Sequence, residues 1–213
     1  MTPTEPSTEI TRLREKGSVD RVALDELLDT TRIGHFGLVD AASGAPVVIP
    51  TAVVRDGDRV LAHGSTGSRW MRALAAGART CLSVTADDGV VVARSAFESS
   101  LHYRSAVLFG SCTTLPAEER EHALDVITDG LIPGRVAELR RPSKSELAAT
   151  LVLALPIERW SLKISHNWPE DIDDDIDGPA WAGVVPRVLG YGTPLPAPDL
   201  RAGIETPESV RRL

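Results

Sequence analysis

The clearest signal of the fold lies in the stretch His63-Gly64-Ser65-Thr66-Gly67-Ser68-Arg69-Trp70. A strand-like run leads into it, and a helix-like run follows over residues 69–76. Between the two runs, two glycines give the backbone additional conformational freedom. Such a junction offers backbone N–H groups to an anion, and the guanidinium of Arg69 adds a planar, charged donor. The stretch therefore predicts a phosphate cradle, although a simple helix cap at Ser68 beside a surface arginine would also fit.

Short β-like runs separated by turn residues surround this stretch. The strands that we expect are Ile33–Asp40, Val47–Val54, Arg59–His63, Thr80–Thr85, Val90–Ala96, Tyr103–Leu115, Leu151–Leu155 and Arg159–Ser165. The helices that we expect follow Asp20, occupy residues 69–76, begin near Pro116, and span Ser143–Thr150 with a capping box. This order is mainly β and does not alternate strand with helix, which favours an antiparallel, Greek-key-like, closed or nearly closed barrel over a doubly wound fold.

Composition divides the chain into three parts. Residues 1–18 are polar and predict a flexible arm, residues 19–166 carry the barrel pattern, and residues 167–213 form an acidic, Pro/Gly-rich tail. We expect the tail to wrap the body or a partner subunit. The hydrophobic fraction of 42% suffices for a core, and the two cysteines make neither a disulfide framework nor a Cys-x-x-Cys metal pair.

Charge and hydropathy exclude several classes of function. Six of the acidic residues behind the net charge of −7 lie within residues 170–177, which predicts a solvated loop, with a divalent-cation site as the alternative. The chain has no basic stripe for nucleic acid, no apolar run long enough for a membrane span, and no leader-like N-terminus. We therefore expect a cytoplasmic protein.

A second polar segment, Ser100–Val107, resembles a strand with chemically useful side chains. Alternation would place Tyr103 and Ser105 on one face and His102 and Arg104 on the other. Tyrosine and arginine could stack on and bind a ligand, but a partly exposed barrel strand would show the same pattern.

Taken in order, several motifs resemble the pyridoxamine 5′-phosphate oxidase-like flavoproteins, in particular the branch of nitroimidazole-resistance proteins. The matching residues are Arg32–Gly37, Ile49–Val53, Leu61–Ser65, Ser68-Arg69, Val92–Phe97, Tyr103–Val107, Leu155-Pro156 and Trp181–Pro186. The resemblance implies an FMN-binding split barrel that forms a homodimer, with a flavin in each cleft between the subunits. FMN is the expected flavin, with FAD or a deazaflavin as alternatives.

The same resemblance implies a set of cofactor-binding residues. Those implied are Pro50, Thr51, Ala52 and Val53 along the flavin ring, His63, Ser65, Ser68 and Arg69 at the phosphate, and Tyr103, Arg104 and Ser105 near the cleft. His102 stands where relatives more often have Asn, which places it on the substrate side.

Flavin-dependent oxidoreduction of a small molecule is the leading functional hypothesis. The flavin performs such chemistry, so no catalytic side chain is required and we assign none. The alternatives are flavin storage without turnover and a haem-binding relative, in which His102 or His166 would be the iron ligand. The five histidines lack the spacing of a catalytic triad or metal site.

Overall fold

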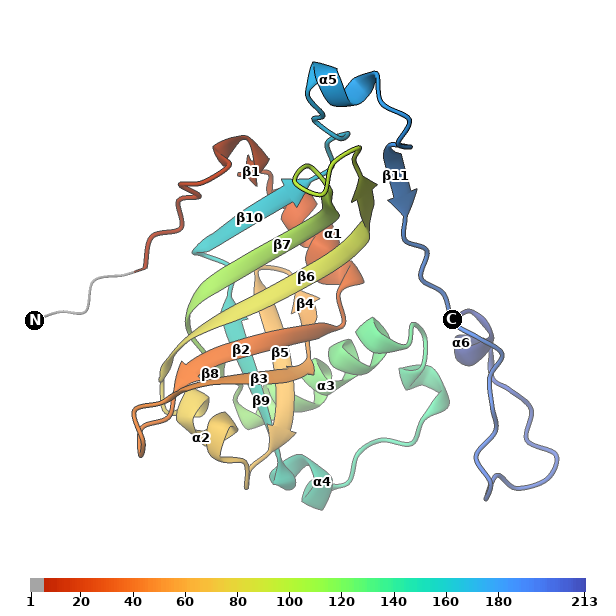
Figure 1. Cartoon of the computed structure of the whole chain (residues 1–213). Helices are drawn as coiled ribbons and strands as arrows, with labels where there is room; N and C mark the ends of the chain where they lie inside the picture. Colours follow the sequence, from red (N-terminus) through yellow and green to blue (C-terminus); the bar gives the residue numbers. More distant parts are fainter. Residues whose placement is uncertain (1–5) are drawn as a thin grey trace, which may run out of the picture. The chain divides into compact units, whose positions relative to one another are not determined.

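The structure of the chain is a computed structural model that describes residues 6–213 (Figure 1). The described residues form two compact units. The first contains residues 6–51, 79–110 and 157–188, and the second contains Ala52–Ala78, Ser111–Pro156 and Leu189–Leu213. Each unit is assembled from separate stretches of sequence, so each core depends on residues that lie far apart in the chain.

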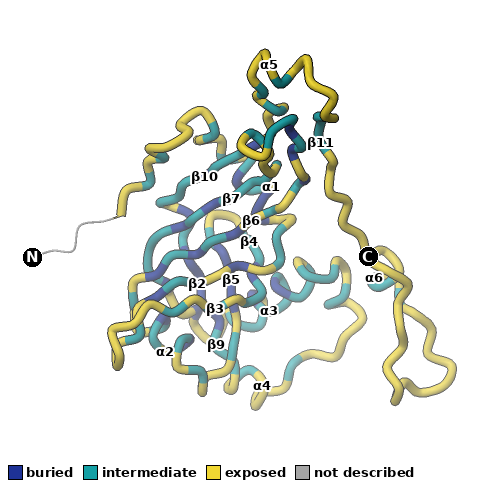
Figure 2. The backbone as a smooth tube through the Cα atoms, viewed as in Figure 1, coloured by how far each residue is buried: buried dark blue, intermediate teal, exposed yellow. Residues whose placement is uncertain are grey.

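The first unit is built on a seven-stranded, mostly antiparallel sheet. Its strands, in order across the sheet, are β1 (Gly17–Ser18), β10 (Trp160–Ser165), β7 (Ser100–Ser111), β6 (Arg79–Val92), β2 (Ile33–Val39) and β3 (Pro46–Ala52). The seventh strand, β11 (Gly183–Pro186), pairs with Gly89–Val92 of β6, while β2 pairs with Thr80–Ser83 of the same strand. Dark segments along these strands in Figure 2 mark their buried positions, among them Phe36, Leu82 and Leu108.

One helix, α1 (Arg21–Thr30), packs in this unit near β6. Asp20 begins it as predicted, because its carboxylate accepts a hydrogen bond from Val22 N at 2.9 Å and so satisfies one of the unpaired N–H groups of the first turn. Leu24, Leu27 and Leu28 fall on one face at helical spacing and are buried. The same unit holds the short helices η1 (Arg14–Lys16) and α5 (Asp173–Ile176).

The prediction of two strands separated by a turn at residues 86–89 was wrong. The structure has a single strand of 14 residues, β6, through this region. A Cβ atom at Gly89 would lie 2.6 Å from the carbonyl oxygen of Val185, so glycine is required for the close approach of β11. Asp88 accepts two hydrogen bonds from Arg104 on β7, both 2.9 Å long, and these hold it in the sheet. The Asp-Gly pair therefore marks a contact between strands, although it resembles a turn signal.

The second unit contains a four-stranded sheet and most of the helices. Its strand order is β4 (Val54–Asp56), β5 (Arg59–Ser65), β9 (Thr150–Pro156) and β8 (Thr113–Thr114). Its helices are α2 (Arg69–Ala75), α3 (Ala117–Leu131), η2 (Val136–Glu138), α4 (Lys144–Ala149) and α6 (Glu208–Arg211). One core cluster joins Leu61, Val152 and Ala154 of the sheet to Ala123 and Ile127 of α3.

Two segments that we expected to be single strands are each divided between the sheets. The segment 47–54 becomes β3 and β4, separated at the buried Val53, and the segment 103–115 contributes to β7 and β8, separated at the buried Cys112. Residues that favour strands continue through both breaks, and such a run carries no information about which strand lies alongside.

Local signals for α3 and α4 were more reliable. Helix α4 has the predicted capping box: Ser143 Oγ accepts from Glu146 N at 3.3 Å, and Glu146 Oε2 accepts from Ser143 N at 2.7 Å. Near its end α3 passes against β4 at Gly130, where a Cβ atom would overlap the side chain of Val54. None of the helices among the described residues is long and apolar enough to cross a membrane.

Candidate functional site

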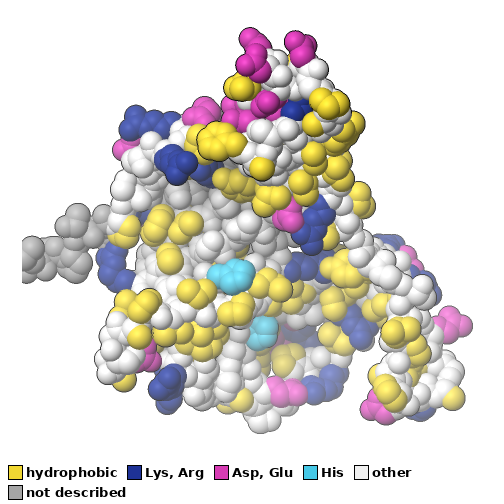
Figure 3. All heavy atoms as spheres, in the orientation of Figure 1, with side chains coloured by type: hydrophobic (Ala, Val, Ile, Leu, Met, Phe, Trp, Pro, Cys, Tyr) yellow, Lys and Arg dark blue, Asp and Glu magenta, His cyan; other side chains and the backbone are white. Residues whose placement is uncertain are grey.

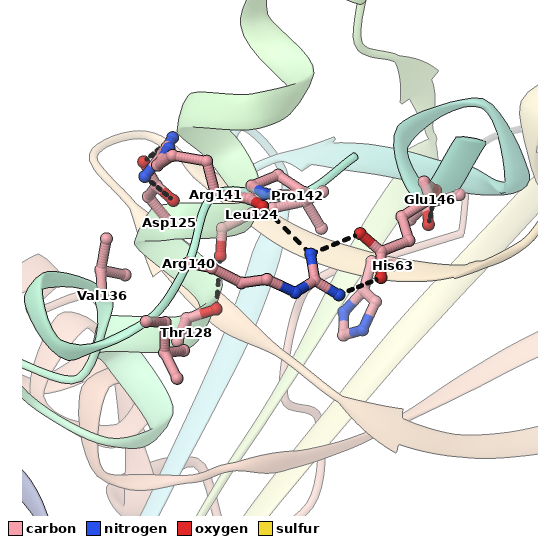
Figure 4. A pocket seen from close by; sticks show the side chains of 11 residues that line it. His63, Leu124, Asp125, Thr128, Val136, Arg140, Arg141, Pro142 and Glu146 are labelled. Carbon is pink, nitrogen blue, oxygen red and sulfur yellow. Dashed lines mark hydrogen bonds and ion pairs between the residues drawn. The ribbon is translucent and has the colours of Figure 1, made fainter. Parts of the chain in front are cut away.

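The second unit contains a cavity of about 440 Å³, within the range typical of small-molecule and cofactor sites. Its apolar and hydroxyl-bearing lining comes from Leu124, Thr128, Val136, Leu139, Pro142 and Thr150. The other lining residues are His63 and two pairs of opposite charge (Figure 4). The elements that form it are β5, α3, the start of β9, α4, and residues 132–143, which connect α3 to α4 and which we call the strap.

His63 is the only imidazole in the lining. It lies on β5, where the register pairs it with Val152 of β9. One side of the residue stays exposed, but its partial removal from water disfavours the charged form and lowers the pKa of His63 below its usual value. The ring is therefore neutral at neutral pH, the state in which an imidazole nitrogen can bind a metal.

Arg140 and Glu146 form an ion pair in the cavity wall. The guanidinium donates from Nη2 to Glu146 Oε1 at 2.6 Å and from Nη1 to Oε2 at 2.9 Å, and Figure 4 shows the two groups pointing toward each other. The hydrogen bonds from Arg140 and from Ser143 N lower the pKa of Glu146 to about 2. Both groups are therefore ionised at neutral pH.

Arg141, next in sequence, is held by two carboxylates of α3. It binds both oxygens of Asp125, at 3.0 and 2.8 Å, and one oxygen of Glu121, at 2.9 Å. These contacts attach the end of the strap to the helix that forms the opposite part of the lining.

Three further hydrogen bonds hold the first part of the strap. Val136 N donates to Asp129 Oδ1 at 2.8 Å, and Ser209 of α6 donates through its backbone N to Glu138 Oε1 at 3.2 Å. The buried Ser209 hydroxyl also donates to Glu138, and this lowers the pKa of that carboxyl. The C-terminal helix thus contributes to the position of the cavity wall.

The predicted phosphate cradle lies at the junction of β5 and α2. Three of its backbone N–H groups are already used within the chain: Thr66 N donates to Ala149 O at 3.0 Å, Gly67 N to Ser65 Oγ at 3.1 Å, and Ser68 N to Ser65 O at 3.0 Å. The side chain of Ser68 makes no capping hydrogen bond. These three N–H groups are therefore not free for a phosphate, and the groups left to contact one are the N–H groups of the first turn of α2 and the side chains of this junction.

The other predicted cofactor residues are distributed over both units. Pro50 and Thr51 belong to the first unit and Ala52 and Val53 to the second, and none of the four lines the cavity. His63 is the one predicted site residue that does.

The predicted strand residues 102–105 all lie on β7 in the first unit. Tyr103 pairs in register with Ser165, and Ser105 pairs with Lys163. Arg104 is engaged by Asp88, and the hydrogen bonds to that carboxylate raise its pKa. His102 Nε2 lies 2.9 Å from Asn167 O, so this ring is occupied by a contact within the chain.

The expectation of a solvated acidic loop was wrong for Asp171. Its side chain is 1% exposed and accepts from Arg94 N at 2.8 Å and from Arg94 Nη1 at 2.9 Å. The acidic residues of α5, which begins two residues later, gather on the surface at the top of Figure 3. Among the described residues, no group of three or more His, Cys, Asp or Glu side chains is arranged to hold a metal ion.

Sequence reasoning missed the charged part of the cavity, Arg140, Arg141 and Asp125. The Arg-Arg-Pro motif directly before the capping box was the available signal, since it places two cations beside an ordered helix start. Glu146 was noticed only as a capping residue, yet it forms half of the Arg140 ion pair.

Comparison with known proteins gives a consistent result. Residues 20–164 match the sequence model of the family described as pyridoxamine 5′-phosphate oxidase. The FAD and heme binding protein from Mycobacterium smegmatis is 53% identical, with a TM-score of 0.89, over 92% of this chain and 96% of that chain. The flavocytochrome Anf3 from Azotobacter vinelandii is 34% identical, with a TM-score of 0.90, over 99% of this chain and 98% of that chain.

A more distant likeness concerns the fold alone. A 5-nitroimidazole antibiotic resistance protein from Bacteroides thetaiotaomicron is 18% identical, with a TM-score of 0.60, over 70% of this chain and 86% of that chain. A search of curated protein sequences found no match. The structural and family matches confirm the family resemblance and the mainly β, flavin-binding split-barrel fold that the sequence predicted.

Proposed function

Because the chain belongs to the pyridoxamine 5′-phosphate oxidase family, we propose that it is a redox flavoprotein that also binds haem in the cavity beside His63. The observation that carries this proposal is a cavity with one neutral imidazole, apolar walls and two arginines. The relatives named above support it, because one is an FAD and heme binding protein and the other a flavocytochrome.

The lining residues fit a haem group chemically. His63 would supply an imidazole to bind the iron, and the apolar side chains Leu124, Val136 and Leu139 would contact the porphyrin. Porphyrin carboxylates need cationic partners, which Arg140 or Arg141 would provide. The bound iron would supply one-electron redox chemistry. No second His and no Met, Cys or Tyr lines the cavity, so His63 is the one side chain of the lining that would bind the iron strongly.

His63 replaces the two histidines that the sequence suggested as haem ligands. His102 is engaged with Asn167 O, and neither His102 nor His166 lines the cavity. The assignment also moves His63 away from the flavin phosphate, where the family resemblance had placed it.

The flavin is proposed to bind at a cleft completed by a second copy of the chain. Its phosphate would bind the side chains of Ser68 and Arg69, and Pro50–Val53 would lie along its ring. The 53% identity to an FAD and heme binding protein favours FAD over FMN. The chemistry is oxidoreduction of a small molecule, with the flavin transferring electrons and the protein orienting it.

His63→Ala tests whether His63 binds haem, as proposed here, or the flavin phosphate, as the family resemblance implies. We expect this variant to lose tight hemin binding, measured as the Soret band during titration, while its flavin content stays that of the wild type. His122→Ala is the matched control, because His122 is exposed on α3 and does not line the cavity. A variant that keeps its Soret band and loses its flavin would show that His63 binds the flavin phosphate.

A further inference from the structure

Arg140 and Arg141 both line the cavity, but their surroundings differ. Arg141 binds two carboxylates of α3, at Asp125 and Glu121, whereas Arg140 binds one carboxylate, that of Glu146. The side chain of Arg140 is also the more exposed of the two, at 72% against 53%. Arg141 is therefore fixed to the helix, while Arg140 can exchange its partner at small cost, because an exposed ion pair contributes little.

Glu146 has a second partner that would remain if Arg140 left. Its Oε2 accepts from Ser143 N at 2.7 Å within the capping box of α4, and its side chain is 49% exposed, so water can replace the guanidinium. If Arg140 moved away from Glu146, neither charge would be both buried and unpaired, because both side chains are exposed to water.

The charges of the cavity lining are balanced, because it contains two cationic residues, Arg140 and Arg141, and two anionic ones, Asp125 and Glu146. A ligand that brings carboxylates into this lining adds negative charge beside two existing carboxylates. Such a ligand is favoured only if a guanidinium turns to it, and Arg140 is the one held by a single carboxylate, besides a 3.1 Å hydrogen bond to its neighbour's backbone oxygen, Arg141 O.

We propose that Arg140 selects the ligand of the cavity by exchanging the carboxylate of Glu146 for a carboxylate of the ligand. Glu146 is the competitor: it holds Arg140 in place in the empty cavity and lowers the affinity for the ligand. The ligand class is an apolar, planar molecule with carboxylate side arms. The exchange deepens the proposed function and rests on it, since haem is the ligand of this class.

The test compares hemin with hemin dimethyl ester, which has the same porphyrin and iron but no free carboxylates. Both are titrated into the full-length protein, and the dissociation constant is read from the Soret absorbance. Arg140→Gln should weaken hemin binding about tenfold and leave the affinity for the ester unchanged. The matched control is Arg14→Gln, which breaks an exposed arginine–glutamate pair with Glu9, outside the cavity lining.

Glu146→Gln separates an exchange from a general effect of charge. Glutamine keeps the capping box, so α4 should stay intact. This variant should bind hemin about threefold more tightly than the wild type, because Arg140 no longer has a competing partner. In an exchange, that gain requires Arg140 and disappears when Glu146→Gln is combined with Arg140→Gln.

Three results would overturn the exchange. Equal weakening of hemin and ester by Arg140→Gln would make Arg140 a packing residue. If Glu146→Gln still raised the affinity for hemin in the absence of Arg140, Glu146 would act only by repelling the carboxylates of the ligand. Weaker hemin binding by Glu146→Gln would mean that Glu146 supports hemin binding together with Arg140 and does not compete with the ligand. A wild-type protein that binds neither porphyrin would refute the haem site itself, together with the exchange, whereas the first three results leave that site standing.

Discussion

Replacing Asp171 by alanine tests whether a buried contact with Arg94 fixes the acidic segment within the first unit. Asp171 accepts two hydrogen bonds from Arg94, one from its backbone N and one from its side chain, at 2.8 and 2.9 Å. The variant leaves both donors without that acceptor. Arg94 Nε is buried and already without a hydrogen-bond partner, so few other hydrogen bonds would stabilise the guanidinium after the loss of Asp171.

The magnitude follows from these contacts. An unpaired, half-buried backbone N–H costs about 1–3 kcal/mol, and breaking a buried ion pair costs about 3–5 kcal/mol. The side chain of Arg94 is 28% exposed and can regain part of its hydration, so we expect a total loss of about 2–3 kcal/mol in the free energy of unfolding. Asp171→Asn should lose less, because the amide oxygen can still accept from Arg94 N.

Urea unfolding followed by circular dichroism measures the loss. Asp174→Ala is the matched control, since Asp174 is exposed on α5, and it should change the free energy of unfolding by less than about 0.5 kcal/mol. Equal stability of Asp171→Ala and Asp174→Ala would refute the reasoning, and the segment would then be the solvated loop that the sequence suggested.

Three other predictions follow from the structure and the proposed function. Arg69→Ala should weaken binding of the phosphate-bearing flavin by roughly 2–4 kcal/mol while sparing riboflavin, as measured by fluorescence quenching; equal weakening of both would make Arg69 structural. Gly89→Ala should cost about 1–3 kcal/mol of stability in thermal unfolding, because its Cβ would meet Val185 O at 2.6 Å; an unchanged melting temperature would contradict the close approach of β11. Light scattering should give about twice the chain mass of 22.8 kDa, and a flavin-loaded monomer would contradict the shared cleft.

Local features of the fold could be predicted from the sequence because their causes are local. Asp20 and the Ser143–Glu146 box satisfy the N–H groups of their own helices, so a few neighbouring residues contain the whole signal. The many short β-rich runs separated by turn residues likewise predicted the mainly β class. Gly89 shows the limit, because its role depends on Val185, which lies almost a hundred residues further along the chain.

The cavity depends still more on distant contacts. His63 could be selected from the sequence as a site residue, but its neighbours come from α3, the strap and α4, and no spacing rule connects them. Arg140 and Glu146 are close in sequence, yet only the path of the strap brings their ion pair to the imidazole's cavity. Under the proposed function, the residue that the sequence placed at the flavin phosphate is the one that would bind the haem iron.

The visible absorption spectrum of the purified protein, after incubation with hemin and removal of the excess, tests the central claim most directly. The proposal predicts a Soret band together with flavin absorption from the same species, and the loss of that Soret band alone in His63→Ala. Flavin absorption without a retained Soret band in the wild-type protein would contradict the claim that the cavity beside His63 binds haem.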